Sequence, residues 1–200
     1  MSDEIARLAA LPTATIYEAA GKLGDMSPDI RSVVPGLRMA GPAFTLKTMP
    51  GDNLAVFKAI AAAPSGAVLV IDGGGTDRVT IWGGTSTVAA QARGLAGCVT
   101  NASVGDLDEI ADSRFPVFAA GVSVRGTAKS HAGWMGIPVS VGGVVVNPGD
   151  IVLADSDGVV VIEAARASAV ANGAEAKRKD ELEREERLRR GEDLGAVMGL

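Results

Sequence analysis

The stretch that decides the fold is residues 67–108, which read AVLVIDGGGTDRVTIWGGTSTVAAQARGLAGCVTNASVGDLD. The apolar run 67–71 predicts a strand buried on both faces, and it ends at Asp72 and three glycines. A small-residue helix is expected over 83–94 and a second strand over 97–101. This strand–helix–strand order indicates a βαβ unit with parallel pairing.

The first turn of the helix over 83–94 is a candidate binding site for a ligand carboxylate. Backbone N–H groups in a first helical turn lack partners inside the helix, and the helix dipole is positive there. Gly83, Gly84 and Thr85 are therefore the expected substrate-binding positions. Asp72 is expected to fix the turn of glycines that follows it, and the alternative is contact with substrate.

A second candidate site follows the strand over 97–101, where Asp106, Asp108 and Glu109 come together in the sequence. Open α/β sheets keep their chemistry at such strand-to-helix turns. A hard cation such as Mg²⁺ or Mn²⁺ prefers carboxylate oxygens, so Asp106 is the expected metal ligand. The alternative is that Asp106 caps the helix expected over 106–113, and the two roles are compatible.

Composition and length fit one soluble domain, either an enzyme or a binding domain. It has 200 residues, a net charge of −5 and one cysteine, Cys98, inside an apolar strand. The acidic balance argues against nucleic-acid and anionic-membrane partners, which require a basic surface. No apolar stretch approaches about 18 residues and the N-terminus lacks signal-peptide features, so a cytoplasmic location is expected. Cys98 is expected to be a core residue.

The remaining elements predict a mixed architecture over residues 1–200. Two short helices are expected over 3–11 and 13–23, within the N-terminal segment of residues 1–26, with Thr13 as the N-cap of the second. After Arg125 the pattern changes to closely spaced strands with turns at 147–150 and 155–158, typical of antiparallel hairpins. The other expected elements are strands over 39–48 and 116–121 and a helix over 53–63.

Several segments, in this order, carry a resemblance to a known family. They are TATIYEAAGKLG (13–24), PGLRMAGPAFTLKTMPGDNL (35–54), AVLVIDGGG (67–75), AAQARGLAG (89–97), GVSVRGTAK (121–129) and GIPVSVGGVVVNPGDIVLADSDGVVVI (136–162). The chain resembles the RraA-like proteins, which include 4-hydroxy-4-methyl-2-oxoglutarate/4-carboxy-4-hydroxy-2-oxoadipate aldolases and regulators of RNase E activity. The resemblance implies an α/β sandwich similar to phosphohistidine-type domains, with a central mixed sheet or barrel and a C-terminal helix.

The resemblance also implies a metal-dependent mechanism. The family's aldolases carry an acidic residue and, after twenty positions, an Arg-Asp pair; here the Asp is Asp106, while Gly84 and Gly105 stand at the other two positions. In the family the Asp ligates a divalent cation and the Arg orients and polarises the substrate. The cation and helix-terminal amides hold a pyruvyl group, which stabilises the enolate.

Cationic side chains elsewhere are candidates to replace the missing Arg. Arg78, beside Asp77, lies between the two glycine clusters, and Arg125 and Lys129 belong to a segment that the resemblance places at the site wall or a subunit interface. His131 is the only histidine, which excludes a site built from several histidines of one chain. It is expected to be exposed, with proton transfer at the site as the alternative.

The segment 163–200 predicts a C-terminal helix and tail. Its charges favour a solvated helix with i,i+4 pairs such as Asp180–Arg184 and Glu183–Arg187. The resemblance implies instead that this helix crosses a subunit boundary of a trimer or hexamer. A glutamate of the neighbouring chain then faces the metal, a role that falls most nearly on Glu181.

Two functional hypotheses follow. The first is a lyase that uses Mg²⁺ or Mn²⁺ at Asp106 to cleave or decarboxylate a small oxo-acid, with a changed substrate. The second is a noncatalytic RraA-like module that binds a protein partner or a small molecule. Gly84 and Gly105 favour the second hypothesis, whereas Asp106 and the intact glycine turns favour the first.

Overall fold

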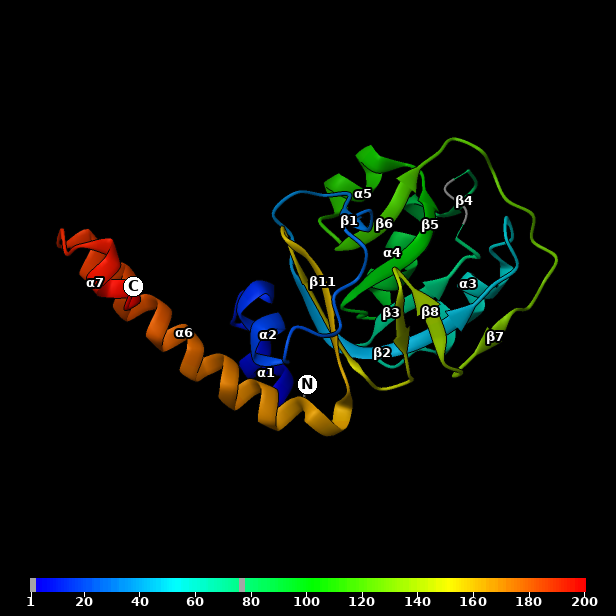
Figure 1. Ribbon diagram of the computed structural model, residues 1–200. Coiled ribbons are helices and arrows are strands. Elements are labelled where there is room, and N and C mark those ends of the chain that lie inside the picture. Colours follow the sequence, from blue (N-terminus) through cyan, green and yellow to red (C-terminus); the bar gives the residue numbers. More distant parts are fainter. Residues whose placement is uncertain (1–2, 76–77) are drawn as a thin grey trace.

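The computed structural model describes residues 3–75 and 78–200. One large sheet forms the centre, with helices on its outer faces (Figure 1). The strands are β1 (Arg31–Ser32), β2 (Met39–Lys47), β3 (Val68–Asp72), β4 (Thr80–Trp82), β5 (Gly97–Val104), β6 (Val117–Val122), β7 (Trp134–Met135), β8 (Val139–Val141), β9 (Val144–Val146), β10 (Ile151–Asp155) and β11 (Gly158–Ile162). The helices are α1 (Asp3–Ala9), α2 (Thr13–Ala19), α3 (Leu54–Ala62), α4 (Gly84–Ala92), α5 (Leu107–Ser113), the 3₁₀ turn η1 (Ala164–Arg166), α6 (Ala167–Arg189) and α7 (Leu194–Met198).

The sheet is mixed, as the sequence predicts. Its order is β1-β6-β5-β3-β2-β10-β11, with β4 beside β5 and β7 beside β2. The strands β2, β3, β5 and β6 run parallel, while β10 pairs antiparallel with both β2 and β11. Because the terminal strands β1 and β11 contact each other, the sheet curls into a nearly closed barrel.

The buried run of β3 has both faces covered. Leu69 and Ile71 face a cluster made with α3, α4 and α5, whereas Val68 and Val70 face a second cluster inside the barrel. Successive side chains of a strand point to opposite faces, so a strand between two apolar layers needs an unbroken apolar sequence. This confirms the strand expected over 67–71.

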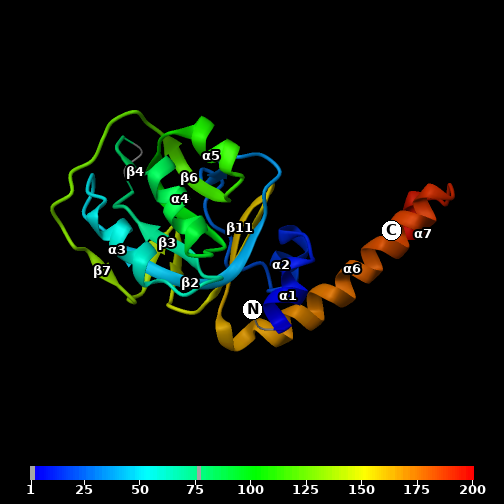
Figure 2. The same cartoon turned by 180° about the vertical axis from the view of Figure 1, so that it is seen from behind.

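A third cluster attaches the N-terminal helices and α6 to the outer face of β10 and β11. Ile151 and Leu153 of β10 face this cluster, and Val152 between them faces the barrel interior. In α6 the buried residues all precede residue 175. The second half of α6 therefore extends away from the body, and α1 and α2 lie between the sheet and α6 (Figures 1 and 2).

Three local expectations differ from the structure. Thr13 is the first residue of α2 rather than its N-cap, because its N–H and hydroxyl both donate to Asp155. The 147–150 turn joins β9 to β10, which belong to different sheets; the hairpin turns lie between β8 and β9 and between β10 and β11. Among the described residues of the tail, Glu183 pairs with Lys179 and Arg187 with Glu192 instead of with each other.

Candidate functional site

A polar cavity of about 340 Å³ lies where the N-terminal ends of α3, α4 and α5 meet. The connection between β6 and β7 closes one side of it, and β4 contributes to its floor. Its lining combines one carboxylate, one ammonium group, several hydroxyls and two aromatic rings. The described lining residues are Asn53, Phe57, Thr80, Trp82, Gly83, Thr85, Ser86, Asp106, Gly126, Thr127 and Lys129.

Asp106 stands at the N-cap position of α5, but its side chain does not cap that helix. Its Oδ2 atom instead accepts a hydrogen bond of 2.9 Å from the N–H of Gly84, at the start of α4. The backbone of Asp106 is left-handed, with φ of 56°, a conformation uncommon for residues other than glycine, asparagine and aspartate. The structure thus directs this carboxylate to the cavity rather than to its own helix.

Carboxylates approach both glycines at the start of α4 closely. A Cβ atom on Gly83 would overlap Oδ2 of Asp106, and one on Gly84 would overlap Oε2 of Glu109. Glu109 lies one turn after Asp106 in α5. A carboxylate from α5 therefore occupies the space that a side chain at residue 84 would take.

The start of α4 is held rigidly by buried contacts. The indole Nε1 of Trp82 donates to Oγ1 of Thr87 at 2.8 Å, and this hydroxyl donates to the Gly83 carbonyl at 3.0 Å. The Trp82 ring is fully buried and stacks on Phe115, with ring centroids 6.1 Å apart. The first-turn N–H groups of α4, including that of Thr85, are thereby fixed at the cavity wall.

The part of the lining that comes from the start of α3 and from the β6–β7 connection carries a cation and an unsatisfied acceptor. Lys129 Nζ lies 5.5 Å from the centroid of the Phe57 ring, a distance at which a cation–π attraction operates. The Oδ1 atom of Asn53 is buried and has no hydrogen-bond partner in the described structure. A buried acceptor without a donor is costly, so a ligand hydroxyl is a suitable partner for it.

The other cationic candidates lie outside the described lining of the cavity. Arg78 and Arg125 flank Ser123, whose hydroxyl donates to the Arg78 carbonyl and accepts from the Arg125 N–H. His131 is exposed, and its backbone N–H donates to Asp52. Asp77 falls outside the described residues. Of the four candidates, Lys129 is the one that the described lining contains.

Glu181 lies on α6, away from this cavity within the same chain. Its carboxylate accepts from the Thr15 hydroxyl at 3.0 Å and pairs with Arg178 at 3.2 Å. Thr15 belongs to α2, so Glu181 helps to attach α2 to α6. A role in the cavity of a neighbouring copy stays a prediction.

The residues around Asp106 suit a cation that keeps most of its water. Within residues 3–75 and 78–200, no three His, Cys, Asp or Glu side chains gather into a metal-binding cluster. Mg²⁺ commonly binds through one or two carboxylates and retains several waters. Asp106 offers one such carboxylate in the cavity, and Glu109 lies near Gly84 but outside the described lining.

The turn after β3 is structural. Asp72 Oδ1 accepts from the Gly74 N–H and from the Asn101 side chain, both at 3.0 Å, and Asn101 Oδ1 accepts from the Gly73 N–H at 2.8 Å. This network confirms that Asp72 fixes the glycine turn. Cys98 is fully buried, and burial raises the pKa of its thiol above the usual range, as expected for a core residue.

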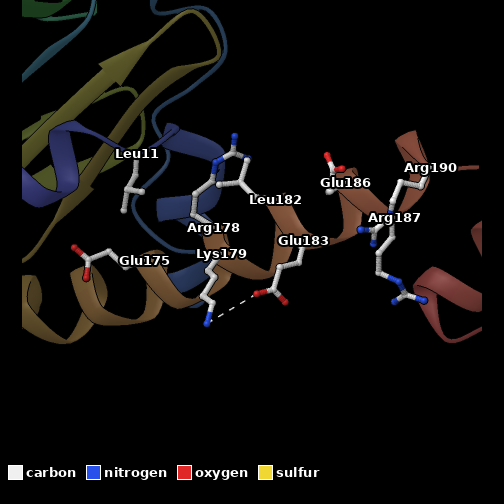
Figure 3. Close-up of a pocket in the computed structure, with 9 residues that line it drawn as sticks. All are labelled: Leu11, Glu175, Arg178, Lys179, Leu182, Glu183, Glu186, Arg187 and Arg190. Carbon is white, nitrogen blue, oxygen red and sulfur yellow. Dashed lines mark ion pairs between the residues drawn. The ribbon is translucent and has the colours of Figure 1, made fainter. Parts of the chain in front are cut away.

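A second hollow runs along the projecting half of α6, and we call it the α6 groove (Figure 3). It has a volume of about 670 Å³. Two leucines, Leu11 and Leu182, lie among charged side chains of both signs, including the Lys179–Glu183 pair. The other charged residues of the groove pair with residues outside its lining, such as Glu175 with Arg7 of α1 and Arg187 with Glu192.

The chain is similar in sequence and in fold to known proteins. The family model described as "RraA-like: Aldolase/RraA" matches residues 13–161. The chain belongs to the Aldolase/RraA family. A "Putative 4-hydroxy-4-methyl-2-oxoglutarate aldolase" of Halalkalibacterium halodurans is 33% identical over 183 residues, covering 92% of this chain and 87% of the relative.

Two solved structures of similar fold support the assignment. An uncharacterised protein from Pseudomonas syringae superposes with a TM-score of 0.84 at 28% identity, covering 98% of this chain and 96% of the other. The RNA-processing inhibitor RraA from Thermus thermophilis has a TM-score of 0.69 at 31% identity, covering 76% and 92%. In this RraA-like chain no described helix combines the length and apolarity needed to cross a bilayer.

Sequence reasoning missed Asn53 and Phe57 of the cavity wall. Both follow the strand over 39–47, and a polar Gly-Asp-Asn segment before an apolar helix was the available signal. The sequence does not show that this segment faces Asp106, because the two lie far apart in the chain.

Proposed function

We propose that this RraA-like chain is a lyase that breaks a carbon–carbon bond of a small 2-oxo acid, by retro-aldol cleavage or decarboxylation, with Mg²⁺ or Mn²⁺ at Asp106. The observation that carries the proposal is the cavity in which the Asp106 carboxylate, the start of α4 and Lys129 face one another. The relatives named as aldolases support a lyase.

The chain's own groups hold the two ends of such a substrate. First-turn N–H groups and hydroxyls at Thr85 and Ser86 receive the carboxylate of the 2-oxo acid, and Gly83 lets it approach the backbone. The Gly84 N–H, expected to join them, already donates to Asp106. Lys129, which the β6–β7 connection contributes to the same lining, receives a second anionic group.

Bond cleavage leaves its electron pair on the pyruvyl fragment as an enolate. The other product is CO₂ in decarboxylation or, in retro-aldol cleavage, a carbonyl compound formed when the hydroxyl group gives up its proton. A proton then converts the enolate to pyruvate. Preorganised positive charge and N–H donors lower the energy of such a transition state. Asp106 would hold a divalent cation, which would supply positive charge that stabilises the enolate. Four further residues keep predicted roles in proton transfer or substrate binding, which single variants would test. They are Arg78, Arg125, His131 and Glu181 of a neighbouring copy.

The test compares Asp106→Ala with Asp108→Ala, a matched carboxylate of the α5 start outside the described lining. Pyruvate released from oxaloacetate and from 4-hydroxy-2-oxo acids is measured with added Mg²⁺, and Mg²⁺ binding is measured by calorimetry. We expect Asp106→Ala to lose at least about 10²-fold in rate and to lose Mg²⁺ binding, as removal of a key electrostatic group does. Equal Mg²⁺ affinity in the two variants would contradict the proposal.

The second candidate function is a noncatalytic module that binds a protein partner or a small molecule. The specific observation in its favour is that the described lining contains no guanidinium, since Gly105 stands where the family's aldolases have arginine. Oxo-acid binding without pyruvate release by the wild type would favour this function.

We also propose that the chain assembles as a trimer or a hexamer of two trimers. The projecting second half of α6 supports this, because it exposes Leu182 and Leu188 beside charges of both signs. Light scattering at micromolar concentration measures the assembly, and a monomer would refute a site shared through Glu181.

A further inference from the structure

One wall of the cavity is a segment without helix or regular strand, residues 126–131, which we call the strap. It belongs to the long connection between β6 and β7 (Figure 1). The strap contributes Gly126, Thr127 and Lys129 to the cavity lining. A connection of this kind needs specific anchors to hold a side chain in place.

The strap is anchored to the start of α3 by two backbone hydrogen bonds. The Asn53 N–H donates to the Ala128 carbonyl at 3.1 Å, and the Ala128 N–H donates to the Gly51 carbonyl at 2.8 Å. These bonds fix the residue before Lys129.

The carboxylate of Asp52 anchors the other side of Lys129. Its Oδ2 atom accepts from the N–H groups of Ser130 at 2.7 Å and His131 at 3.0 Å, and its Oδ1 accepts from the Leu54 N–H at 3.0 Å. Asp52 is only 4% exposed. Burial of a carboxylate is costly without partners, and here two of its three N–H donors come from the two residues after Lys129.

We propose that Asp52 is a positioning residue that holds Lys129 against the cavity, so that the ammonium group receives the second carboxylate of a dicarboxylic 2-oxo acid. The proposal rests on the proposed function, in which the cavity binds an oxo-acid. Lys129 itself contacts the ligand, and Asp52 acts on binding only through the strap. The names of the relatives already describe such a dicarboxylic 2-oxo acid, and the inference concerns which residues of this chain hold its second carboxylate.

The variant Asp52→Asn removes the charge of the Asp52 carboxylate and one of its acceptor oxygens, while the side chain keeps nearly the same size and shape. An asparagine has one acceptor oxygen and one NH₂ group, so it leaves an N–H group of Leu54 or of the strap facing another donor. A matched control is Thr48→Val, which removes the 2.7 Å hydrogen bond from the Thr48 hydroxyl to the Asp52 carbonyl and leaves the carboxylate contacts intact.

Ligand binding is measured by calorimetry in Mg²⁺ with two probes, 2-oxoglutarate and pyruvate, which differ in the distal carboxylate. We expect Asp52→Asn and Lys129→Met each to weaken 2-oxoglutarate binding about tenfold, equivalent to about 1.4 kcal/mol, and to leave pyruvate binding within about twofold. The double variant should bind like Lys129→Met alone. Independent, additive losses in the double variant would overturn the proposal, as would an equal loss with Thr48→Val.

Hydrogen exchange of the Ser130 and His131 amides in the wild type tests the anchor without any ligand or variant. Both residues are exposed, so we expect protection only through the Asp52 carboxylate. Exchange at the rate of a free loop would overturn the proposal even if Asp52→Asn fails to fold. If the wild type binds neither probe, the proposed function is refuted, and with it the role of Lys129 in ligand binding. Protected Ser130 and His131 amides would in that case still confirm that Asp52 anchors the strap.

Discussion

Gly84 determines where a carboxylate from another element lies. The sequence suggests that an acidic group has been lost at this position, since the resembling aldolases carry an acid there. In the structure Glu109 of α5 fills the space that a side chain at residue 84 would occupy, next to the Gly84 N–H that bonds Asp106. Asp106 precedes α5 and Glu109 lies in its first turn, and both carboxylates reach the start of α4.

Gly84→Ala is expected to displace the Glu109 carboxylate without unfolding the protein. The overlapping atom is the end of a flexible side chain, and alanine is the better helix former by up to about 1 kcal/mol. If Glu109 supports a cation at Asp106, Mg²⁺ affinity should fall about tenfold, as for other groups that surround metal ligands. Glu109→Gln is the matched variant for calorimetry, and wild-type affinity in both variants would show that Glu109 has no role in binding.

Gly105→Arg with Gly84→Glu restores the residue types that the aldolases carry. The new glutamate would overlap Glu109, so the change is made together with Glu109→Ala. A Cβ on Gly105 would lie 3.2 Å from the Ser123 carbonyl oxygen and from Thr80, a tight fit for an arginine stem. We expect no gain in pyruvate release, because the cavity is arranged around Lys129. A large gain from an inactive parent would instead identify the protein as a scaffold that has lost its reaction.

At the scale of elements, burial periodicity predicted strands better than it predicted side-chain partners. The unbroken apolar run of β3 and the hairpin of β10 and β11 follow from their sequences, because only one arrangement buries their apolar faces. The charges of α6 did not identify their partners. Glu183 pairs with Lys179 rather than with Arg187. The alternative ion pairs of exposed, long side chains differ little in free energy, so the sequence does not determine which one forms.

The projecting half of α6 is expected to hold copies of the chain together through its leucines. Replacing both Leu182 and Leu188 with glutamine should reduce the molecular mass measured by light scattering to that of a monomer, because the two side chains are 46% and 38% exposed in the single chain. Leu23→Gln is the control, an exposed leucine after α2 and away from the α6 groove. An unchanged mass in the double variant would exclude this half of α6 from the interface.

For the whole molecule, the sequence predicted the mixed sheet and some of the cavity. Asp106, Thr85 and Lys129 were expected and do line one cavity. Asp52 and Asn53 were not expected, because their roles depend on contact with residues about 75 positions later in the chain, such as the Asp52–Ala128 bridge. Such contacts arise where the strap lies beside residues 51–53, just before α3, and no local sequence pattern encodes that placement.

Stability is expected to fall in acid because several carboxyl groups have lowered pKa values. Side-chain bonding to Arg7 lowers the pKa of Glu175, and Lys177 does the same for Glu18; both pairs join α6 to the N-terminal helices. Burial opposes ionisation of Asp52, but its three backbone N–H donors outweigh burial and lower its pKa. A lowered folded-state pKa gives stability that is present above the ordinary carboxyl pKa of about 4 and is lost as the pH falls through the lowered value.

Added salt should distinguish the stability that comes from the Glu18 and Glu175 ion pairs from the stability that comes from the Asp52 hydrogen bonds. Glu18 and Glu175 have half-exposed side chains, so about 0.5 M NaCl should screen their pairs, whereas the buried Asp52 contacts should persist. Thermal unfolding of the wild type, Asp52→Asn and Glu175→Gln is followed from pH 7 to pH 2. We expect the Asp52→Asn deficit to be salt-independent at pH 7 and to vanish as the pH falls through the lowered pKa of Asp52. The stability that Glu175→Gln loses relative to the wild type should already be smaller at pH 7 in high salt. If Asp52→Asn is still less stable than the wild type at pH 2, the effect of Asp52 does not arise from its ionised carboxylate.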